Sequence, residues 1–209
     1  PLSRRAARRA LALPEVGPVI GTVARLSREK GVDVLLRAVA LLRRAGHPVT
    51  CVVIGDGPEG PALRRLAARL GAAPWVRWAG TRPDAARLLR AVDLYVQPSR
   101  REAFGLAAAE AMAAARPVVA SRVGGLAELL RDGLEGRLVP PGDARALARV
   151  LSELLLDEGQ RQRLARAAAA RASRWPGTPV LARQHLDLYA ELAAPAPAAA
   201  PRHRPGRRA

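Results

Sequence analysis

Two glutamates, Glu102 and Glu110, are separated by seven residues in the segment PSRREAFGLAAAEAMAAARPVVA. A helix predicted over 106–114 begins between them, and the free backbone amides at a helix start suit an anion. A helix rises about 1.5 Å per residue, so Glu110 lies roughly 6–7 Å along the axis from the turn at Gly105–Leu106. We therefore expect the two carboxylates to hold separate hydroxyl-bearing groups, with phosphates between them, instead of forming a close acid–base pair.

The surroundings of Glu110 leave a second interpretation open, in which it is an ordinary solvated helix residue. Small side chains on the same helix favour close packing instead: Ala107, Ala108, Ala109, Ala111, Ala113 and Ala114. An acid on a tightly packed helix is more often buried for a purpose.

Two cations, Arg25 and Lys30, stand five positions apart in the loop that follows the first predicted strand. Such a pair can straddle a diphosphate through charge-assisted hydrogen bonds. Lys30 is the only lysine among 35 basic residues, and it precedes Gly31 in this loop. The alternative is that the loop is simply solvated and binds no ligand. The positions of Arg25 and Lys30 do not decide between a diphosphate site and a solvated loop.

Two glycine-rich turns also follow predicted strands. The turn Gly55–Gly60, GDGPEG, lacks the GxGxxG spacing and carries two acids that would repel an anion, so we predict a plain tight turn. The pair Gly124-Gly125 either lets the backbone approach a ligand or simply starts a helix, and both interpretations stay open.

Apolar runs of five or six residues alternate with amphipathic stretches, which predicts βαβ units and a doubly wound parallel sheet of the α/β class. The predicted strands are Val19–Ala24, Thr50–Ile54, Val76–Gly80, Leu94–Gln97, Pro117–Ser121 and Gly136–Val139. The predicted helices cover 32–45, 60–70, 83–91, 106–114, 125–131, 143–156, 158–174 and 178–193. Ligands bind outside the carboxyl ends of such strands, where Glu102, Arg25 and Lys30 are expected.

The formal net charge of +17 suggests a nucleic-acid partner, but two features argue against it. The arginines are spread along every predicted helix, as codon bias in a GC-rich genome would produce. Aromatic residues make up 3%, too few for a base-stacking platform. We expect no nucleic-acid partner, and an electrostatic contact with an anionic membrane surface is the stronger alternative.

The remaining composition limits the cofactors and the location. Cys51 is the only cysteine, which excludes an intramolecular disulfide and a cysteine-based metal site and favours a cytoplasmic location. No DxD pair or His/Cys/Asp cluster has metal-binding spacing, so we expect no protein-bound metal. No apolar run reaches the roughly 18 residues that a membrane-spanning helix needs.

Three segments are expected along the chain. The sequence opens without Met on PLSRRAARRALALPEVGP, like a stretch from the middle of a longer protein, and the family resemblance given below implies that residues 1–14 are the remnant of an interdomain linker. Residues 15–193 are predicted to form one Rossmann-like domain, and the family resemblance given below implies that this domain binds a nucleotide sugar. Residues 194–209, a tail of Pro, Ala and Arg with nothing to pack, are predicted to be disordered.

The segments together resemble the carboxyl-terminal domain of retaining GT-B-fold glycosyltransferases, especially glycosyltransferase family 4, over roughly Leu13 to Tyr189. The matching segments are VARLSREKG, VVIGDGPEG, VRWAGTRPD, VDLYVQPS, EAFGLAAAE, EAMAAARPVVAS, VGGLAELLRDGLEGRLVPPGD and the late pair Trp175 and Tyr189. Each is weak alone, whereas their order and spacing are highly specific.

The resemblance implies a role for each site residue. Arg25 and Lys30 would hold the diphosphate of a nucleoside-diphosphate sugar, and Glu110 would accept hydrogen bonds from the ribose hydroxyls. Glu102 would contact the transferred sugar near its reacting carbon, as the candidate catalytic residue. Sugar hydroxyls and phosphate would meet the backbone of Ala103, Phe104, Gly105 and Leu106, and Arg82 would lie near the base. The resemblance also implies transfer with retention, without a metal or any further cofactor.

The family pattern differs from this sequence in places. The family often has Gly where Ala24 and Ala115 stand, and Pro or Gly at the position of Ala103. A positive φ at Ala115 would cost roughly 1 kcal/mol.

Related enzymes carry the acceptor site on an amino-terminal domain, which we expect as a separate chain or domain. The last helix, at 178–193, then exposes an apolar face, and the chain alone is expected to be inactive. The acceptor, whether a glycan, a lipid or a small molecule, is not specified. A non-catalytic nucleotide-sugar-binding module is the main alternative. A sugar-nucleotide 2-epimerase would need further acids and a His that the sequence does not offer.

Overall fold

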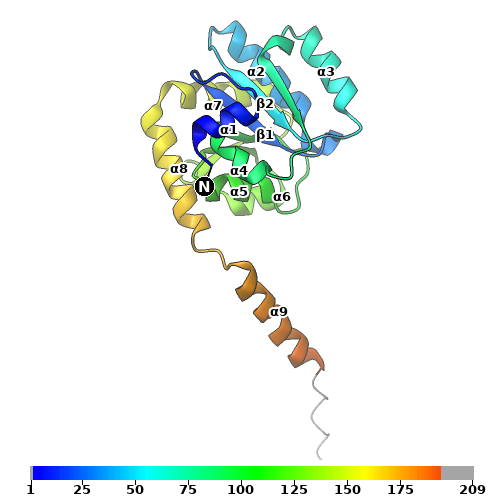
Figure 1. The fold of residues 1–209 in the computed structure, drawn as a ribbon, viewed down its shortest axis with the longest axis vertical. Coiled ribbons are helices and arrows are strands. Elements are labelled where there is room, and N and C mark those ends of the chain that lie inside the picture. Colours follow the sequence, from blue (N-terminus) through cyan, green and yellow to red (C-terminus); the bar gives the residue numbers. More distant parts are fainter. Residues whose placement is uncertain (1, 194–209) are drawn as a thin grey trace, which may run out of the picture. The chain divides into compact units, whose positions relative to one another are not determined.

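The computed structural model describes residues 2–193, which contain a six-stranded parallel sheet. The strand order is β3-β2-β1-β4-β5-β6. Figure 1 shows the neighbouring strands β1 and β2 among the helices of this unit. The strands are β1 Val19–Val23, β2 Thr50–Ile54, β3 Val76–Gly80, β4 Leu94–Gln97, β5 Val118–Ser121 and β6 Gly136–Val139. This is the order of a doubly wound, Rossmann-like fold, and the fold class predicted from the sequence is confirmed.

The sheet is covered on both faces because its strands are apolar in both side-chain directions. Along β1, Ile20 belongs to the large core cluster, whereas its neighbour Val19 points to the other face. Both side chains are fully buried. A strand of this kind has no solvent-facing side, which accounts for its nearly continuous apolar sequence.

The helices follow the strands in alternation. They are α2 Val32–Arg44, α3 Gly60–Arg69, α4 Ala85–Leu88, α5 Leu106–Ala113, α6 Gly124–Leu129, α7 Ala144–Leu156 and α8 Glu158–Ala172. Helices α7 and α8 begin at acidic caps, since the side chain of Asp143 accepts from two backbone amides and that of Asp157 from one. The helix predicted over 83–91 is divided, because a 3-10 turn, Leu89–Ala91, replaces its second half.

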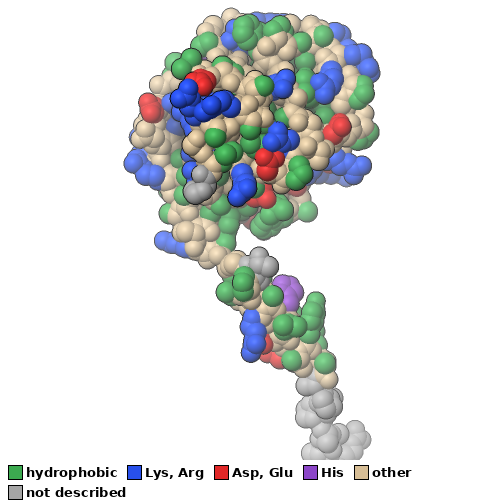
Figure 2. Space-filling model, in the orientation of Figure 1, with side chains coloured by type: hydrophobic (Ala, Val, Ile, Leu, Met, Phe, Trp, Pro, Cys, Tyr) green, Lys and Arg blue, Asp and Glu red, His purple; other side chains and the backbone are tan. Residues whose placement is uncertain are grey.

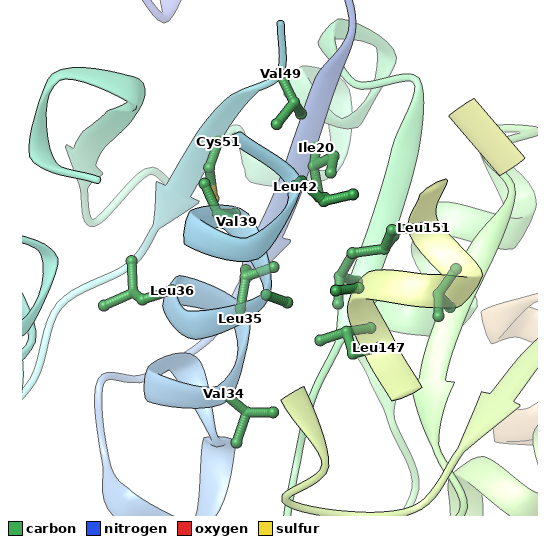
Figure 3. Close-up of a cluster of buried hydrophobic side chains, with 14 of the residues drawn as sticks. Ile20, Val34, Leu35, Leu36, Val39, Leu42, Val49, Cys51, Leu147 and Leu151 are labelled. Carbon is green, nitrogen blue, oxygen red and sulfur yellow. The ribbon is translucent and has the colours of Figure 1, made fainter. Parts of the chain in front are cut away.

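One side of the sheet is covered by α2 and α7, which pack directly against each other. Figure 3 shows Leu147 and Leu151 of α7 pointing toward α2, where Leu35 lies opposite them. These leucines are 0–1% exposed. Their burial fixes α2, and therefore the loop that leads from β1 into α2.

The segment 1–14 was predicted to be a linker, and in the structure it contains a helix, α1 Arg4–Ala10. Helix α1 packs against α4 and the 3-10 turn that follows it. Arg8 is 1% exposed and donates to the backbone oxygens of Ala91, Pro14, Glu15 and Gly17 and to the carboxylate of Asp93. Residues 2–14 are therefore part of the packed unit that contains the sheet.

The chain divides into two compact units at Arg174/Trp175, within the span predicted as one domain, 15–193. The second unit contains α9 Thr178–Ala193, which begins at the residue predicted from the sequence. Large apolar side chains of α9 are exposed: Val180, Leu181, Leu186, Leu188, Tyr189 and Leu192. The tail predicted to be disordered, 194–209, lies outside the described residues. Within the described chain, no helix is both long enough and apolar enough to cross a bilayer.

Candidate functional site

A cleft of about 510 Å³ opens where the strand order reverses, between the loops that follow β1, β4 and β5. Its walls are Lys30, Arg100, Arg101, Glu102, Ala103, Val123 and Gly124. A second hollow of about 300 Å³ lies over β1, β2 and β3 and is lined by Val23, Ala24, Arg25, Ile54, Gly55, Asp56, Thr81, Arg82 and Ala85. Both lie at the carboxyl ends of the strands, where ligands of doubly wound sheets bind. We call the first the switch-point cleft and the second the side hollow.

An ion pair joins the two sides of the switch-point cleft. Lys30 Nζ donates to both carboxylate oxygens of Glu102, at 2.9 Å each. The two side chains are only 24% and 11% exposed. Lys30 ends a 3-10 turn, Arg28–Lys30, and Gly31 then adopts a φ of 64° before α2 starts. The sequence placed both residues at this edge of the sheet but did not predict their pairing.

Glu102 is held by two further donors. Its Oε2 accepts from Gln97 Nε2 at 3.1 Å and from Ser99 Oγ at 3.0 Å. Gln97 in turn accepts a hydrogen bond from the hydroxyl of Tyr95, whose pKa is raised, mainly by burial. Oε2 thus has three donors, whereas Oε1 has only Lys30 among the described residues. The oxygen Oε1 is therefore the one that can accept a hydrogen bond from a ligand if Lys30 moves.

Close backbone contacts fix the two loops that carry Lys30 and Glu102. A Cβ on Gly31 would lie 2.0 Å from the carbonyl oxygen of Pro98, so only glycine fits there. The backbone amide of Arg100 donates to the carbonyl of Glu29 at 2.7 Å. The guanidinium of Arg100 grips Asp33 at the start of α2 with two bonds of 2.6 and 2.8 Å. These contacts preset the distance between Lys30 and Glu102.

Asp33 and Arg100 were not predicted as site residues. Burial alone would raise the pKa of Asp33, but hydrogen bonds from Arg100 and Arg37 outweigh it and hold that pKa below its usual value. The pair links the first turn of α2 to the β4 loop and so positions the site, where Arg100 is also part of the cleft wall. Sequence spacing gave no signal for it, since 67 residues separate the partners.

Gln97 and Ser99 were also missed. Both are fully buried, at 2% and 0% exposure, and both lie at or just beyond the end of β4. Polar residues that end an otherwise apolar strand are the available signal, because burying them demands hydrogen-bond partners.

The glycine pair that opens α6, Gly124 and Gly125, has a packing role. A Cβ on Gly124 would lie 2.1 Å from the carbonyl oxygen of Glu102, and one on Gly125 would lie 2.3 Å from that of Ala103. The amide of Gly125 also donates to the carbonyl of Glu102 at 3.2 Å. Of the two interpretations left open by the sequence, these contacts favour a glycine pair that seats the Glu102 loop, while Gly124 also forms part of the cleft wall.

The start of α5 lies between two exposed side chains and has no side-chain cap. Gly105, with a φ of 93°, precedes the helix, and no side chain caps its first amides. Phe104 and Leu106 are 58% and 65% exposed, and Ala103 is also exposed. Uncapped amides at a helix start are unsatisfied donors with a favourable dipole for an anion.

Glu110 lies on the second turn of α5 and is half-buried. Burial raises its pKa above the ordinary value. Its carboxylate makes no hydrogen bond or ion pair with another residue in the range 2–193. A desolvated carboxylate without a donor is a strong acceptor for ligand hydroxyls, and the close packing expected around Glu110 is only partial.

The side hollow contains the two remaining predicted residues. Arg25 is exposed on its wall. Arg82 is engaged by Asp84 at 2.9 and 3.0 Å and by the carbonyl of Ala10 at 3.3 Å. Arg25 thus remains available to an anion, whereas Arg82 is held in place by its neighbours.

The GDGPEG turn packs against the loop that follows β1. A Cβ on Gly55 would lie 2.0 Å from the carbonyl oxygen of Ala24. Leu26 donates to the carbonyl of Asp56 at 2.9 Å and accepts from the amide of Glu59 at 2.9 Å. The turn supports the Arg25 loop, which agrees with the tight turn predicted from the sequence.

The surface charge is spread over several elements. In Figure 2 the arginine and lysine side chains form separate patches over the visible face instead of one continuous band. On this face the distribution agrees with arginines spread along the chain.

Comparisons with known proteins agree with this geometry. Residues 3–171 match the model of the family described as glycosyl transferases group 1. The D-inositol 3-phosphate glycosyltransferase of Corynebacterium urealyticum is 41% identical over 198 residues, covering 89% of this chain and 46% of that protein. The chain therefore spans less than half the length of this relative.

Solved structures show the same architecture. The crystal structure of Anabaena HepE in complex with UDP-glucose matches with a TM-score of 0.83 at 30% identity, covering 90% of this chain and 52% of that one. The C-terminal domain of a glycosyl transferase group 1 family protein from Francisella tularensis matches with a TM-score of 0.70 at 27% identity, covering 80% and 90%. The chain belongs to the glycosyl transferases group 1 family, and its fold is that of the carboxyl-terminal domain of these proteins.

Proposed function

We propose that this chain binds a nucleoside-diphosphate sugar in the switch-point cleft and the adjoining side hollow, as the donor-binding half of a retaining glycosyltransferase of family 4. The observation that carries the proposal is the Lys30–Glu102 pair, held at the point where the strand order reverses. It puts a cation for a phosphate and an acceptor for a sugar hydroxyl within 2.9 Å of each other.

Each site residue then has a distinct task. Lys30 and Arg25 contact the diphosphate, together with the uncapped amides at the start of α5. Glu110 accepts from the ribose, since its carboxylate has no donor among the described residues. Glu102 turns Oε1 toward the sugar, while Gln97 and Ser99 keep Oε2 in place.

The bond between the sugar's anomeric carbon and the diphosphate oxygen breaks during transfer, and the diphosphate leaves with its electron pair. Negative charge grows on that oxygen, and cations and helix amides already aimed at it lower the barrier. Lys30, Arg25 and the α5 amides can supply this stabilisation without a metal. In a retaining reaction the acceptor hydroxyl oxygen forms the new bond to the anomeric carbon on the same face, and its proton passes to the departing diphosphate oxygen.

Two relatives suggest which ligands to try first. HepE of Anabaena is seen with UDP-glucose, so UDP-sugars are the first donors we propose. The proteins of this family that act on D-inositol 3-phosphate suggest a phosphorylated polyol as the acceptor. We propose that acceptor binding requires residues beyond this chain's donor site.

A calorimetric titration of UDP, GDP and ADP at low salt, with EDTA present, tests the proposal. We expect saturable binding of at least one of them, and affinity that falls as salt rises, because Lys30 and Arg25 act through charge. Lys30→Gln should weaken binding, whereas Arg149→Gln, at an exposed arginine of α7, should not. No binding of any of the three would contradict the proposal.

The alternative is a module that binds the nucleotide sugar without catalysing its transfer. Slow hydrolysis of UDP-sugar to UDP by the chain, lost in Glu102→Gln, would favour an enzyme over this module.

A further inference from the structure

A third cavity, of about 500 Å³, lies at the edge of the sheet opposite to the donor site. It is lined by residues that immediately precede three strands, Pro18 before β1, Asp93 before β4 and Pro117 before β5. The amino ends of parallel strands share one edge, so the cavity cannot be part of the switch-point cleft. Helix α8 closes its other side through Glu158, Arg161, Gln162 and Ala165. We call it the amino-edge pocket.

The carboxylate at its floor, Asp93, is fully engaged. Its Oδ1 accepts from Arg4, and its Oδ2 accepts from Arg8 at 2.8 Å and from the amide of Val19 at 2.8 Å. Arg8 is buried, and its pKa is lowered by desolvation first and by the charge of Arg4 as well, against the opposing effect of Asp93. One carboxylate thus already serves two guanidiniums.

Two more guanidiniums line the pocket and are held only by backbone oxygens. Arg116 donates Nε to the carbonyl of Ala114 at 3.1 Å and Nη1 to that of Val92 at 3.3 Å. Arg161 donates Nη1 to the last carbonyls of α7, at Leu154 and Leu155. Within residues 2–193, neither forms an ion pair. Each guanidinium has five N–H donors, so each retains donors beyond these bonds.

The charges around the amino-edge pocket do not balance. Burial lowers the pKa of Arg116, and the nearby charges of Arg4 and Arg90 lower it further, against Asp93. Glu158 is the second carboxylate of the lining, and it accepts from Gln162 at 3.0 Å. Among the described residues, three guanidiniums, those of Arg4, Arg116 and Arg161, line the pocket against the two carboxylates, and the buried guanidinium of Arg8 adds a fourth positive charge behind Asp93.

We propose that the amino-edge pocket binds a small, doubly charged oxyanion of the phosphomonoester class, gripped by Arg116 and Arg161. Guanidinium pairs favour phosphate oxygens because they form charge-assisted and bidentate bonds. A dianion would also offset the excess positive charge that desolvation leaves unscreened. The volume of about 500 Å³ suits a small phosphorylated molecule.

Calorimetric titration of the full chain with inorganic phosphate at low salt tests this binding. We expect saturable binding, weakened at least about tenfold by Arg161→Gln and by Arg116→Gln, since each removes a charge-assisted bond. Arg149→Gln removes an exposed arginine of α7 and should leave phosphate affinity within about twofold. Circular dichroism melting checks the fold, and Arg161→Gln alone carries the test if Arg116→Gln does not fold.

Phosphate could also occupy the donor site, so the titration is repeated in Lys30→Gln. Binding that survives Lys30→Gln but is lost in Arg161→Gln supports the amino-edge pocket, whatever the donor site binds. Binding lost in Lys30→Gln and retained in Arg161→Gln overturns it. Equal weakening in Arg149→Gln, or no saturable binding at all, overturns it too, since only non-specific attraction would then remain.

The phosphomonoester could come from a soluble metabolite or from a lipid headgroup. Glycerol 3-phosphate in solution and vesicles that contain phosphatidic acid separate these sources. Arg161-dependent binding of either probe supports the pocket and identifies the source, and binding of neither overturns the assignment.

Discussion

The Lys30–Glu102 ion pair should compete with the diphosphate of a bound nucleotide, because Lys30 cannot hold both partners fully. The informative change is Glu102→Gln, which keeps the shape of the side chain and an acceptor oxygen but removes the negative charge. We expect this variant to bind free UDP more tightly than the wild type does. A residue that only supported the fold would give the opposite result.

The size of the effect follows from the geometry. At the observed 2.9 Å, the Coulomb attraction is about 6 kcal/mol for an effective dielectric constant of ~20. Most of it is offset by dehydration and side-chain ordering, and pairs near the surface contribute only about 1 kcal/mol. This pair is 24% and 11% exposed, so we place its net contribution at about 1–2 kcal/mol. UDP affinity should therefore rise roughly 5–30-fold in Glu102→Gln.

A double-mutant cycle separates competition for Lys30 from direct repulsion between Glu102 and the diphosphate. Calorimetric titration of UDP is compared among the wild type, Glu102→Gln, Lys30→Gln and the double variant. If the ion pair competes, at least half of the gain disappears in the Lys30→Gln background. Weaker UDP binding in Glu102→Gln, or an unchanged gain without Lys30, would refute the reasoning.

Three further variants test other parts of the structure. Glu110→Gln should weaken UDP binding by about 1–3 kcal/mol and leave pyrophosphate binding unchanged in calorimetry. The pKa of Glu110 is higher in the folded state than its unfolded value of about 4.3, so the folded state loses stability as pH rises from about 4.3 through the folded-state pKa. At pH 7 Glu110→Gln should therefore raise the thermal midpoint. The pKa of Asp33 is lower in the folded state than its unfolded value of about 3.9, so its stabilising effect is present above about pH 3.9 and is lost as pH falls through the folded-state pKa. In urea melts, Asp33→Asn should lower the free energy of unfolding at pH 7, and that free energy should fall less on acidification than in the wild type. Ala115 has a φ of 54°, which strains an alanine but not a glycine. After subtraction of the extra conformational entropy that glycine gives the unfolded chain, Ala115→Gly should increase the free energy of unfolding by about 0.5–1 kcal/mol. An unchanged urea midpoint would contradict this.

The strands were predictable because the sheet is buried on both faces. Five of the six predicted strands begin at the residue observed, and the sixth differs by one residue, at Pro117 against Val118. Helix α1 was missed because its sequence, RRAARRA, offers few apolar residues, and its burial depends on Arg8. A buried arginine is stabilised by the carbonyls of distant segments, such as that of Ala91, and local sequence does not reveal such partners.

Related proteins often have glycine where Ala115 stands, and the structure gives Ala115 a φ of 54°, the left-handed region in which the strain considered from the sequence applies. The amide of Ala115 bonds to the carbonyl of Met112, and that of Arg116 to Ala111, which is the Schellman arrangement that ends α5.

The site was predictable in location but not in connectivity. Strand–helix alternation placed Arg25, Lys30 and Glu102 at one edge of the sheet. The hydrogen bonds between Lys30 and Glu102 span 72 residues and depend on how the loops pack, which no local pattern records. The contact of Gly31 with Pro98 and the grip of Arg100 on Asp33 decide that packing.

The close approach of Gly31, Gly124 and Gly125 to carbonyl oxygens of the β4 loop has a genetic consequence. Every amino acid other than glycine carries a Cβ, which would lie 2.0, 2.1 or 2.3 Å from one of these oxygens. A base change in any of these three codons is therefore harmless only when it is synonymous. In a random mutagenesis library of this chain, the codons for Gly31, Gly124 and Gly125 should vary at their third base alone among variants that keep the cleft.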